Sequence, residues 1–262
     1  GFPALGITGA AISTALSNVL AFILMFGYVI RGKSVVKLTL KKFRFQRNVL
    51  ENLVKIGVPA SAEQFVLRTG LMFFAKIVAS LGTSVYAAHQ IAISILGLSF
   101  NPGMAFGIAA SALVGRALGE EDPDLAYSYG IQARKLGSFI ASFIGFLFLI
   151  FAPWFVSLYN KDPHVIATAS IALRIIALIQ PFQSSQLILA GALRGAGDTV
   201  STFVATLISL LIVRVSLAYL LVNVYPYGIA GAWTAALVDQ LVRWVIVRHR
   251  FNRGKWKEIE LH

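Results

Sequence analysis

The residues of this chain best suited to chemistry are polar and charged groups inside a long apolar stretch. Glu63 lies there, four residues after Pro59. Ser61, Gln64 and Arg68 follow helical spacing and would form one polar stripe beside it. A charge at the centre of a membrane costs at least about 2.5 kcal/mol, and such residues usually serve a function. The pattern predicts that Glu63 takes up and releases a proton or a monovalent cation.

The structural alternative for Glu63 is an ion pair with a basic residue. Arg68 is a poor partner on the same helix because five residues correspond to about 140° of rotation. A partner on another helix is therefore expected, and Arg68, Arg174 and Arg214 are the basic residues inside apolar stretches that we consider. Both readings of Glu63 stay open at this point.

Two further segments could line a cavity. Three glutamines, Gln180, Gln183 and Gln186, follow one another at a spacing of three beside a proline. Asn101 directly precedes Pro102 in the middle of another apolar run. Polar or broken helical segments inside a membrane usually line a water-filled space. Hydrogen bonds between helices, worth about 0.6 to 2 kcal/mol each, would explain the glutamines equally well, and a packing kink would explain Asn101.

Composition places these segments in a membrane protein. The chain has 262 residues, of which 57% are hydrophobic and 13% charged, whereas soluble domains carry about 25% charged residues. The net charge of +12 comes in blocks between apolar runs, which is typical of membrane proteins rather than of proteins that bind nucleic acid. Cysteine is absent from the sequence, which excludes disulfides and thiolate metal sites. No nucleophile with a base, and no metal-ligand spacing of histidines, points to an enzyme or a metal site.

Seven stretches are long and apolar enough to span a membrane as helices. They cover residues 5–30, 53–80, 85–118, 137–158, 165–193, 200–222 and 228–247. Basic residues crowd the first connection, 31–50, and the C-terminal tail, 251–262. The positive-inside rule therefore places both in the cytoplasm and the first residue outside. A short surface helix is expected to begin at Pro123, with Asp122 as its N-cap.

A short internal repeat suggests how these spans are organised. The sequence GITGA at 6–10 returns as GIAGA at 228–232, each time after a nearby proline and at the start of a span. The repeat predicts the end of one six-helix unit followed by a second complete unit, although small-residue patterns also recur wherever membrane helices pack. Because the chain begins with Gly1 and enters an apolar run at once, we expect it to be the downstream piece of a longer protein.

Four motifs resemble those of one transporter family. They are GVPASAEQ at 57–64, AAHQI at 87–91, VGRALG at 114–119 and LRGAGDT at 193–199. In this order they are similar to the multidrug and toxic compound extrusion (MATE) transporters. The resemblance implies an all-α integral membrane protein of seven transmembrane helices, the last six forming one lobe of a two-lobe, twelve-helix transporter. Residues 1–30 would be the last helix of the N-terminal lobe, 31–50 a basic inter-lobe loop, 51–250 the six-helix C-terminal lobe and 251–262 a basic cytoplasmic tail.

The resemblance also implies a function. Family members export drugs and other small amphipathic compounds across the cell membrane in exchange for protons or sodium, by alternating access. Glu63 matches the acid of their seventh helix that is implicated in coupling, and the coupling ion would be H+ or Na+ with no other cofactor. Some relatives carry further carboxylates where this chain has Gln90, Gln183 and Arg68, which favours a proton over a multi-ligand ion site. The residues expected to line the substrate path are Gln64, Arg68, Gln90, Asn101, Gln180, Gln183 and Gln186.

The expected partners are a small-molecule substrate, membrane lipid and the N-terminal lobe of the same protein, without which the chain should not transport. A flippase for lipid-linked anionic precursors is the alternative function. Flippases of this kind share the architecture, and Arg68, Arg174 and Arg214 would suit an anionic headgroup better than a drug cation.

Overall fold

The computed structural model describes residues 6–30 and 47–259, and every regular element in these stretches is helical. Most of the predicted loop 31–50, and residues 260–262, lie outside the described residues. The chain divides into two units between Leu50 and Glu51. In order the elements are α1 (Gly6–Ile30), α2 (Arg47–Ala79), α3 (Thr83–Gly119), α4 (Pro123–Ser157), α5 (Pro163–Gly195), α6 (Thr199–Thr206), η2 (Leu207–Val215), α7 (Ser216–Tyr219), η3 (Leu220–Val224), α8 (Gly228–Asn252) and η4 (Lys255–Glu258). Of these, η2 and η3 are π-helical stretches and η4 is a 3-10 turn.

The first unit contains α1, an uninterrupted helix of 25 residues that is long and apolar enough to cross a membrane. It begins at Gly6, whose φ is 52°, and α8 of the second unit begins at Gly228, whose φ is 58°. Glycine adopts this left-handed conformation at little cost. The two glycines open the repeated GITGA and GIAGA sequences, so the matching helix starts support the internal repeat.

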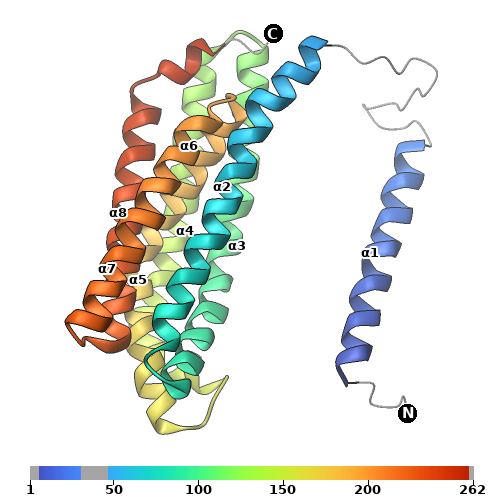
Figure 1. Ribbon diagram of the computed structural model, residues 1–262. Coiled ribbons are helices and arrows are strands. Elements are labelled where there is room, and N and C mark those ends of the chain that lie inside the picture. The colour runs from blue at the N-terminus through green and yellow to red at the C-terminus, as the bar shows by residue number, and fades with distance from the viewer. Residues whose placement is uncertain (1–5, 31–46, 260–262) are drawn as a thin grey trace. The chain divides into compact units, whose positions relative to one another are not determined.

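In the second unit the helices from α2 to α8 run side by side along one axis (Figure 1). The central helix is α5, which packs against α3, α4 and α8 and has more than half of its side chains buried. Within the described stretches, α1, α3, α4, α5, α8 and the combined helix Thr199–Val224 are each long and apolar enough to span a membrane. The helix α2 is 33 residues long, and it carries Glu63, Gln64 and Arg68 within its apolar run. The all-α membrane architecture predicted from the sequence is confirmed.

The turns of the second unit gather at two ends (Figure 1). The basic end is formed by the turns 119–123 and 195–199 and by residues 252–259, with arginines and lysines in and around them. The opposite end is formed by the turns 79–83, 157–163 and 224–228, which contain Lys161 as their one lysine or arginine. The described lobe therefore has the charge asymmetry that membrane proteins show across a bilayer.

The helix α4 differs from the predicted arrangement. A separate surface helix beginning at Pro123 and a span at 137–158 were expected, whereas α4 covers Pro123–Ser157 and its one break in helical geometry is a kink at Phe151. Its start is as predicted, because the side chain of Asp122 accepts a hydrogen bond from the Leu125 amide at 2.9 Å. The helix continues without a break from Pro123 past Gly137, and a Cβ at Gly130 would lie 2.5 Å from the ring of Phe251, so that glycine allows close packing. The prediction of a separate surface helix was wrong.

The C-terminal segment is packed against the lobe. Trp256 is fully buried, donates a hydrogen bond from Nε1 to the Phe251 carbonyl at 2.7 Å, and stacks on the Phe251 ring. Lys257 forms an ion pair of 2.8 Å with Asp124 at the start of α4. Residues 251–258, predicted as part of a basic tail, thus close the basic end of the lobe.

Glycines bring α3 and α5 into backbone contact. A Cβ at Gly191 would clash with the Gly107 carbonyl, and one at Gly195 would clash with the Ser111 carbonyl. Small residues at a spacing of four allow this close approach between membrane helices. The α5 end that carries the LRGAGDT motif is therefore held rigidly against α3.

We predict that Gly191→Ala lowers the thermal stability of the purified full-length protein in detergent. The added methyl meets backbone atoms, which cannot move independently, and overpacking of this kind costs about 1–3 kcal/mol. The matched control is Gly97→Ala on α3, where no atom lies within 4 Å of the new Cβ. Equal melting temperatures for the two variants would contradict the backbone contact.

Candidate functional site

Glu63 belongs to a narrow buried stripe on α2. The buried positions are Glu63, Val66, Gly70, Phe74 and Val78, which lie on one side of the helix at spacings of three and four. The neighbouring positions on α2 are more exposed. The helix is thus attached to the rest of the lobe along a single seam, and Glu63 is the residue of that seam nearest the basic end.

Three side chains bind the Glu63 carboxylate, which is 3% exposed. Arg194 donates from Nη2 to Oε1 at 2.7 Å, and Thr206 donates from Oγ1 to the same oxygen at 3.1 Å. Thr202 lies 3.0 Å from Oε2 and also 2.9 Å from the Thr199 carbonyl. Its hydroxyl has a single proton, so it donates to one of these acceptors at a time. The carboxylate therefore has two committed donors and a third that it shares.

Glu63 thus forms an ion pair, as the structural alternative predicted, but its partner is a different arginine from the three considered. Arg68, Arg174 and Arg214 were proposed as partners, whereas the ion pair is made by Arg194. The Arg194 side chain is 34% exposed, so one partner is buried and the other reaches the surface. Such a pair can open without exposing the whole interior.

The LRGAGDT motif, residues 193–199, places these donors. It ends α5, turns through Gly197, whose φ of 81° favours glycine, and starts α6. The Asp198 carboxylate caps α6 by accepting from the Ser201 amide at 3.3 Å and forms an ion pair of 2.6 Å with Arg250 of α8. The motif thus forms a helix stop, a glycine turn and an N-cap in succession. Their consequence is that the last turn of α5 and the first turns of α6 both face Glu63.

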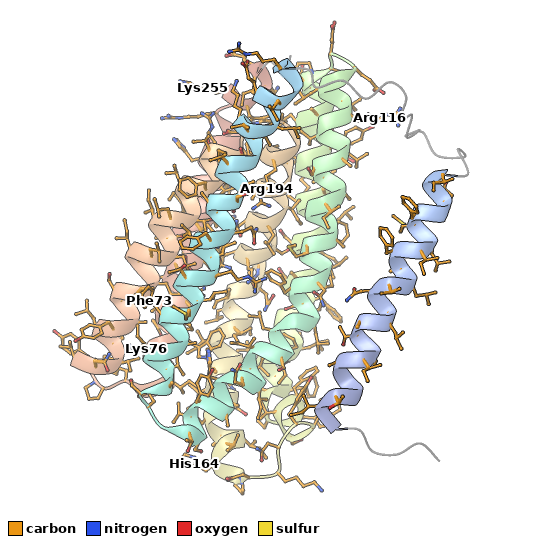
Figure 2. All side chains as sticks on the ribbon, turned by 45° about the vertical axis from the view of Figure 1, so that its right-hand side comes forward. Phe73, Lys76, Arg116, His164, Arg194 and Lys255 are labelled. Carbon is orange, nitrogen blue, oxygen red and sulfur yellow. The ribbon has the colours of Figure 1, made fainter. Side chains whose placement is uncertain are left out.

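Glu63 does not lie at the centre of the lobe. Its partner Arg194 belongs to the last turn of α5, and in Figure 2 Arg194 lies toward the end that carries Lys255. A second acid, Asp239, lies midway along α8 and is fully buried.

Asp239 forms a second buried ion cluster. It pairs with Arg214 at 2.7 Å and with Arg243 at 3.0 Å, and Arg243 also donates from Nε to Ser209 at 2.8 Å. Two guanidinium groups share one carboxylate, so this cluster carries one surplus positive charge. Asp239 thus has two arginine partners, whereas Glu63 has one.

The other predicted site residues fall into two groups. Gln64, Arg68, Gln90 and Asn101 are exposed on the described lobe, and Gln90 donates from Nε2 to the Tyr86 hydroxyl at 2.9 Å. By contrast, the side chains of α5 expected to line a cavity, Gln180, Gln183 and Gln186, are 1%, 8% and 4% exposed. The three glutamines of α5 lie inside the lobe, whereas Gln64, Arg68, Gln90 and Asn101 lie on its surface. A role in lining a substrate path stays a prediction for both groups.

We predict that the Glu63–Arg194 pair shows strong energetic coupling in a double-mutant cycle on the full-length protein. Arg194→Gln removes a hydrogen bond to a charged group, worth about 1.5–3 kcal/mol. Adding Glu63→Gln should restore part of the lost thermal stability, because no carboxylate is then left buried without its counter-ion.

The matched control pair is Arg116–Glu120, which has a similar distance of 2.9 Å but is exposed, with side chains 76% and 50% accessible. Exposed pairs contribute about 0–1 kcal/mol. Additive effects of Glu63→Gln and Arg194→Gln, no different from the control cycle, would show that the buried pair is not coupled.

Comparison with known proteins agrees with this architecture. The MatE family model matches residues 59–220. A probable multidrug resistance protein NorM of Thermotoga maritima and an uncharacterized transporter YisQ of Bacillus subtilis are each 30% identical to this chain, over 98% of it and over 55% and 56% of their own lengths. A solved structure described as the outward-facing conformation of a multidrug resistance MATE family transporter has a TM-score of 0.87 at 22% identity, covering 96% of this chain and 57% of that one.

The chain thus spans about half the length of the curated relatives it matches. Many of the curated relatives carry the name of a multidrug resistance protein, NorM or MdtK. Since the family model covers more than half of its residues, the chain belongs to the MatE family of membrane transporters.

Proposed function

We propose that this chain, together with an N-terminal lobe, exports drugs or other small amphipathic compounds across the cell membrane in exchange for a cation. Family membership and the names of the relatives support the transport of small molecules. The observation that carries the coupling is the buried Glu63 carboxylate, held by one partly exposed guanidinium and two hydroxyls. The chain matches about half of the length of each of these relatives. This supports the proposal that the other half of the transporter is a separate lobe and that this chain does not transport alone.

In the described conformation Arg194 supplies the positive charge that Glu63 needs. When Glu63 takes up a proton, the attraction to Arg194 is lost, while Thr202 or Thr206 can still hydrogen-bond the neutral carboxyl. Arg194 then turns outward to the surface that it already reaches. When the proton leaves, the guanidinium returns. The proton and Arg194 thus compete for one carboxylate, which is the requirement for an ion-driven switch.

Protonation of Glu63 would affect α2 because Glu63 is the first of the buried residues that attach this helix to the lobe. Toward the basic end, the α2 side chains before Glu63 whose burial is described are exposed or half-buried, so Glu63 is the buried anchor of α2 nearest that end among them. Loss of the ion pair weakens that anchor and lets the segment preceding Glu63 move relative to α5 and α6. Alternating access would use this movement to open one side of the substrate path and close the other.

We further propose a proton rather than sodium as the coupling ion. The oxygen atoms that approach Glu63 belong to two hydroxyls, Thr202 and Thr206. Gln90 and Arg68 stand where some relatives carry additional carboxylates, and both lie on the exposed surface of the lobe. A proton needs a single base, whereas a metal ion needs several oxygen ligands.

The charge asymmetry of the lobe supports an orientation across the cell membrane in which the basic end and the C-terminus face the cytoplasm. The opposite end, with Lys161 as the lysine of its turns, would face outward. In this orientation the Glu63–Arg194 pair lies in the inner half of the membrane.

The flippase alternative is supported by two exposed arginines. Arg68 on α2 and Arg174 on α5 are exposed and form no ion pair with another described residue, so both are free to meet an anionic headgroup. Arg214, the third arginine considered, is bound to Asp239. A strain lacking the protein separates the two functions, because drug sensitivity indicates an exporter and accumulation of a lipid-linked intermediate indicates a flippase.

We predict that Glu63→Gln in the full-length protein abolishes drug efflux driven by a proton gradient, because the amide cannot exchange a proton. Reconstituted vesicles with a fluorescent organic cation provide the measurement. The control is Glu120→Gln, an exposed acid at the basic end that should leave efflux unchanged. Undiminished efflux in Glu63→Gln would end the coupling proposal.

We predict that a proton gradient alone drives efflux by the full-length protein in sodium-free vesicles, and that a sodium gradient at constant pH does not. The single carboxylate with two hydroxyl neighbours is the physical reason. Efflux that depends on sodium and is indifferent to pH would show that the missing oxygen ligands are supplied elsewhere in the protein.

A further inference from the structure

A groove separates α2 from the helix formed by η2, α7 and η3 toward the opposite end of the lobe. The two pack closely at Gly70, where a Cβ would lie 2.6 Å from the Leu210 side chain. Residues further along both helices line an open cavity of about 640 Å³. Phe73 and Ile77 form one wall and Tyr219 and Leu220 form the other. The lining is therefore apolar over most of its area.

The polar groups of the groove gather near the ends of its two helices. Lys76 lies on the same face of α2 as Phe73 and Ile77, and Asn223 comes one turn after Tyr219. Phe73 and Lys76 line the cavity together with Ser216 and Tyr219 of α7. Figure 2 shows Lys76 closer than Phe73 to the opposite end of the lobe. The groove thus has an apolar body and a cationic, hydrogen-bonding mouth.

Positive charge in the groove is not balanced by an acid. Lys76 forms no ion pair with another residue in 6–30 or 47–259, and the groove lining contains no aspartate or glutamate. Behind the lining, Arg214 directly precedes Val215 and belongs to the Asp239 cluster, which carries one surplus positive charge. An occupant with a negative headgroup and an apolar body complements this arrangement.

We propose that the groove between α2 and α7 binds one anionic phospholipid, with its phosphate on Lys76 and Asn223 and an acyl chain between the walls. The volume is in the range of about 300–1,000 Å³ that suits a small molecule. The groove opens to the exposed side of the described lobe, where Phe73, Tyr219 and Leu220 are 45%, 57% and 44% exposed. In a membrane-spanning lobe, lipid is the anionic amphiphile present at the highest concentration. This proposal does not depend on the coupling role of Glu63.

Snorkelling of Lys76 to the headgroup layer is the simpler explanation for a lysine near the end of a membrane helix. Snorkelling would need no groove and would show no dependence on residues of α7. A substitution that fills the groove from the other wall therefore separates the two explanations. Ser216 is suited to this because it lines the groove from α7 and is exposed.

The test uses the full-length protein purified in detergent and mixed with equal amounts of phosphatidylglycerol and phosphatidylcholine, with native mass spectrometry counting the retained lipids. We expect preferential retention of phosphatidylglycerol by the wild type, a drop of about fivefold in Lys76→Gln, and retention in Lys76→Arg. Ser216→Trp should remove the bound lipid of either kind. The matched control is Lys161→Gln, which removes an exposed charge from the same end outside the groove.

Three results would overturn the proposal. Equal retention of the two lipids by the wild type would show that the groove does not select an anion. Unchanged phosphatidylglycerol in Lys76→Gln or in Ser216→Trp would place the lipid elsewhere or leave snorkelling as the explanation. A wild type that retains no lipid would indicate that another segment of the full-length protein, or a second copy, covers the groove. Size-exclusion profiles identical to the wild type confirm that each variant is folded.

Discussion

A carboxylate with 3% of its surface exposed must have its charge balanced, and the basic end of this lobe is built around that requirement. The balancing guanidinium comes from the last turn of α5, 131 residues after Glu63 in the chain. For Arg194 to reach it, α5 must end at that level and must lie close to α3. Gly195 permits the close approach, and Gly197 provides the left-handed residue at which α6 turns back. Asp198 then caps α6 and binds α8 through Arg250. The glycine-rich motif thus positions two ion pairs, Arg194 with Glu63 and Asp198 with Arg250.

The helix that begins with α6 lies between two acids. On one side Glu63 of α2 binds Thr202 and Thr206. On the other side Asp239 of α8 pairs with Arg214. The two acids differ in the number of counter-ions: Glu63 has one, which is partly exposed, and Asp239 has two, which are nearly buried. One contact can therefore open at modest cost while the other keeps the helix attached to α8. A change at Glu63 would move α2 relative to a helix that stays in place.

The sequence was sufficient for those features that depend on neighbours along the chain. Apolar runs predicted the membrane helices, and Asp122 was recognised as an N-cap because capping needs only a side chain and the next turn. Glu63 stood out because an acid in an apolar helix is costly wherever the helix lies.

Features that depend on the packing of separate helices were not predictable in this way. Arg194 reads as part of a turn, and nothing along the chain indicates that the turn lies beside Glu63. A signal was present, since an arginine at the end of a helix before a tight glycine turn can reach a neighbouring helix. The glutamines of α5 illustrate a second limit: their polarity indicates that they avoid lipid, but a cavity and a helix interface satisfy them equally, and they are buried in the lobe. Gly130 of α4 is a third case: its missing side chain leaves room for the ring of Phe251, a contact between residues far apart in the sequence.

The exchange of Arg194 for a proton on Glu63 is tested most directly by infrared difference spectroscopy of the full-length protein during a pH titration. We predict that acidification produces a protonated carboxyl band in the wild type, that this band is absent in Glu63→Gln and that it persists in Asp239→Asn. A band that is unchanged in Glu63→Gln would contradict the account, because the proton would then bind to a different group.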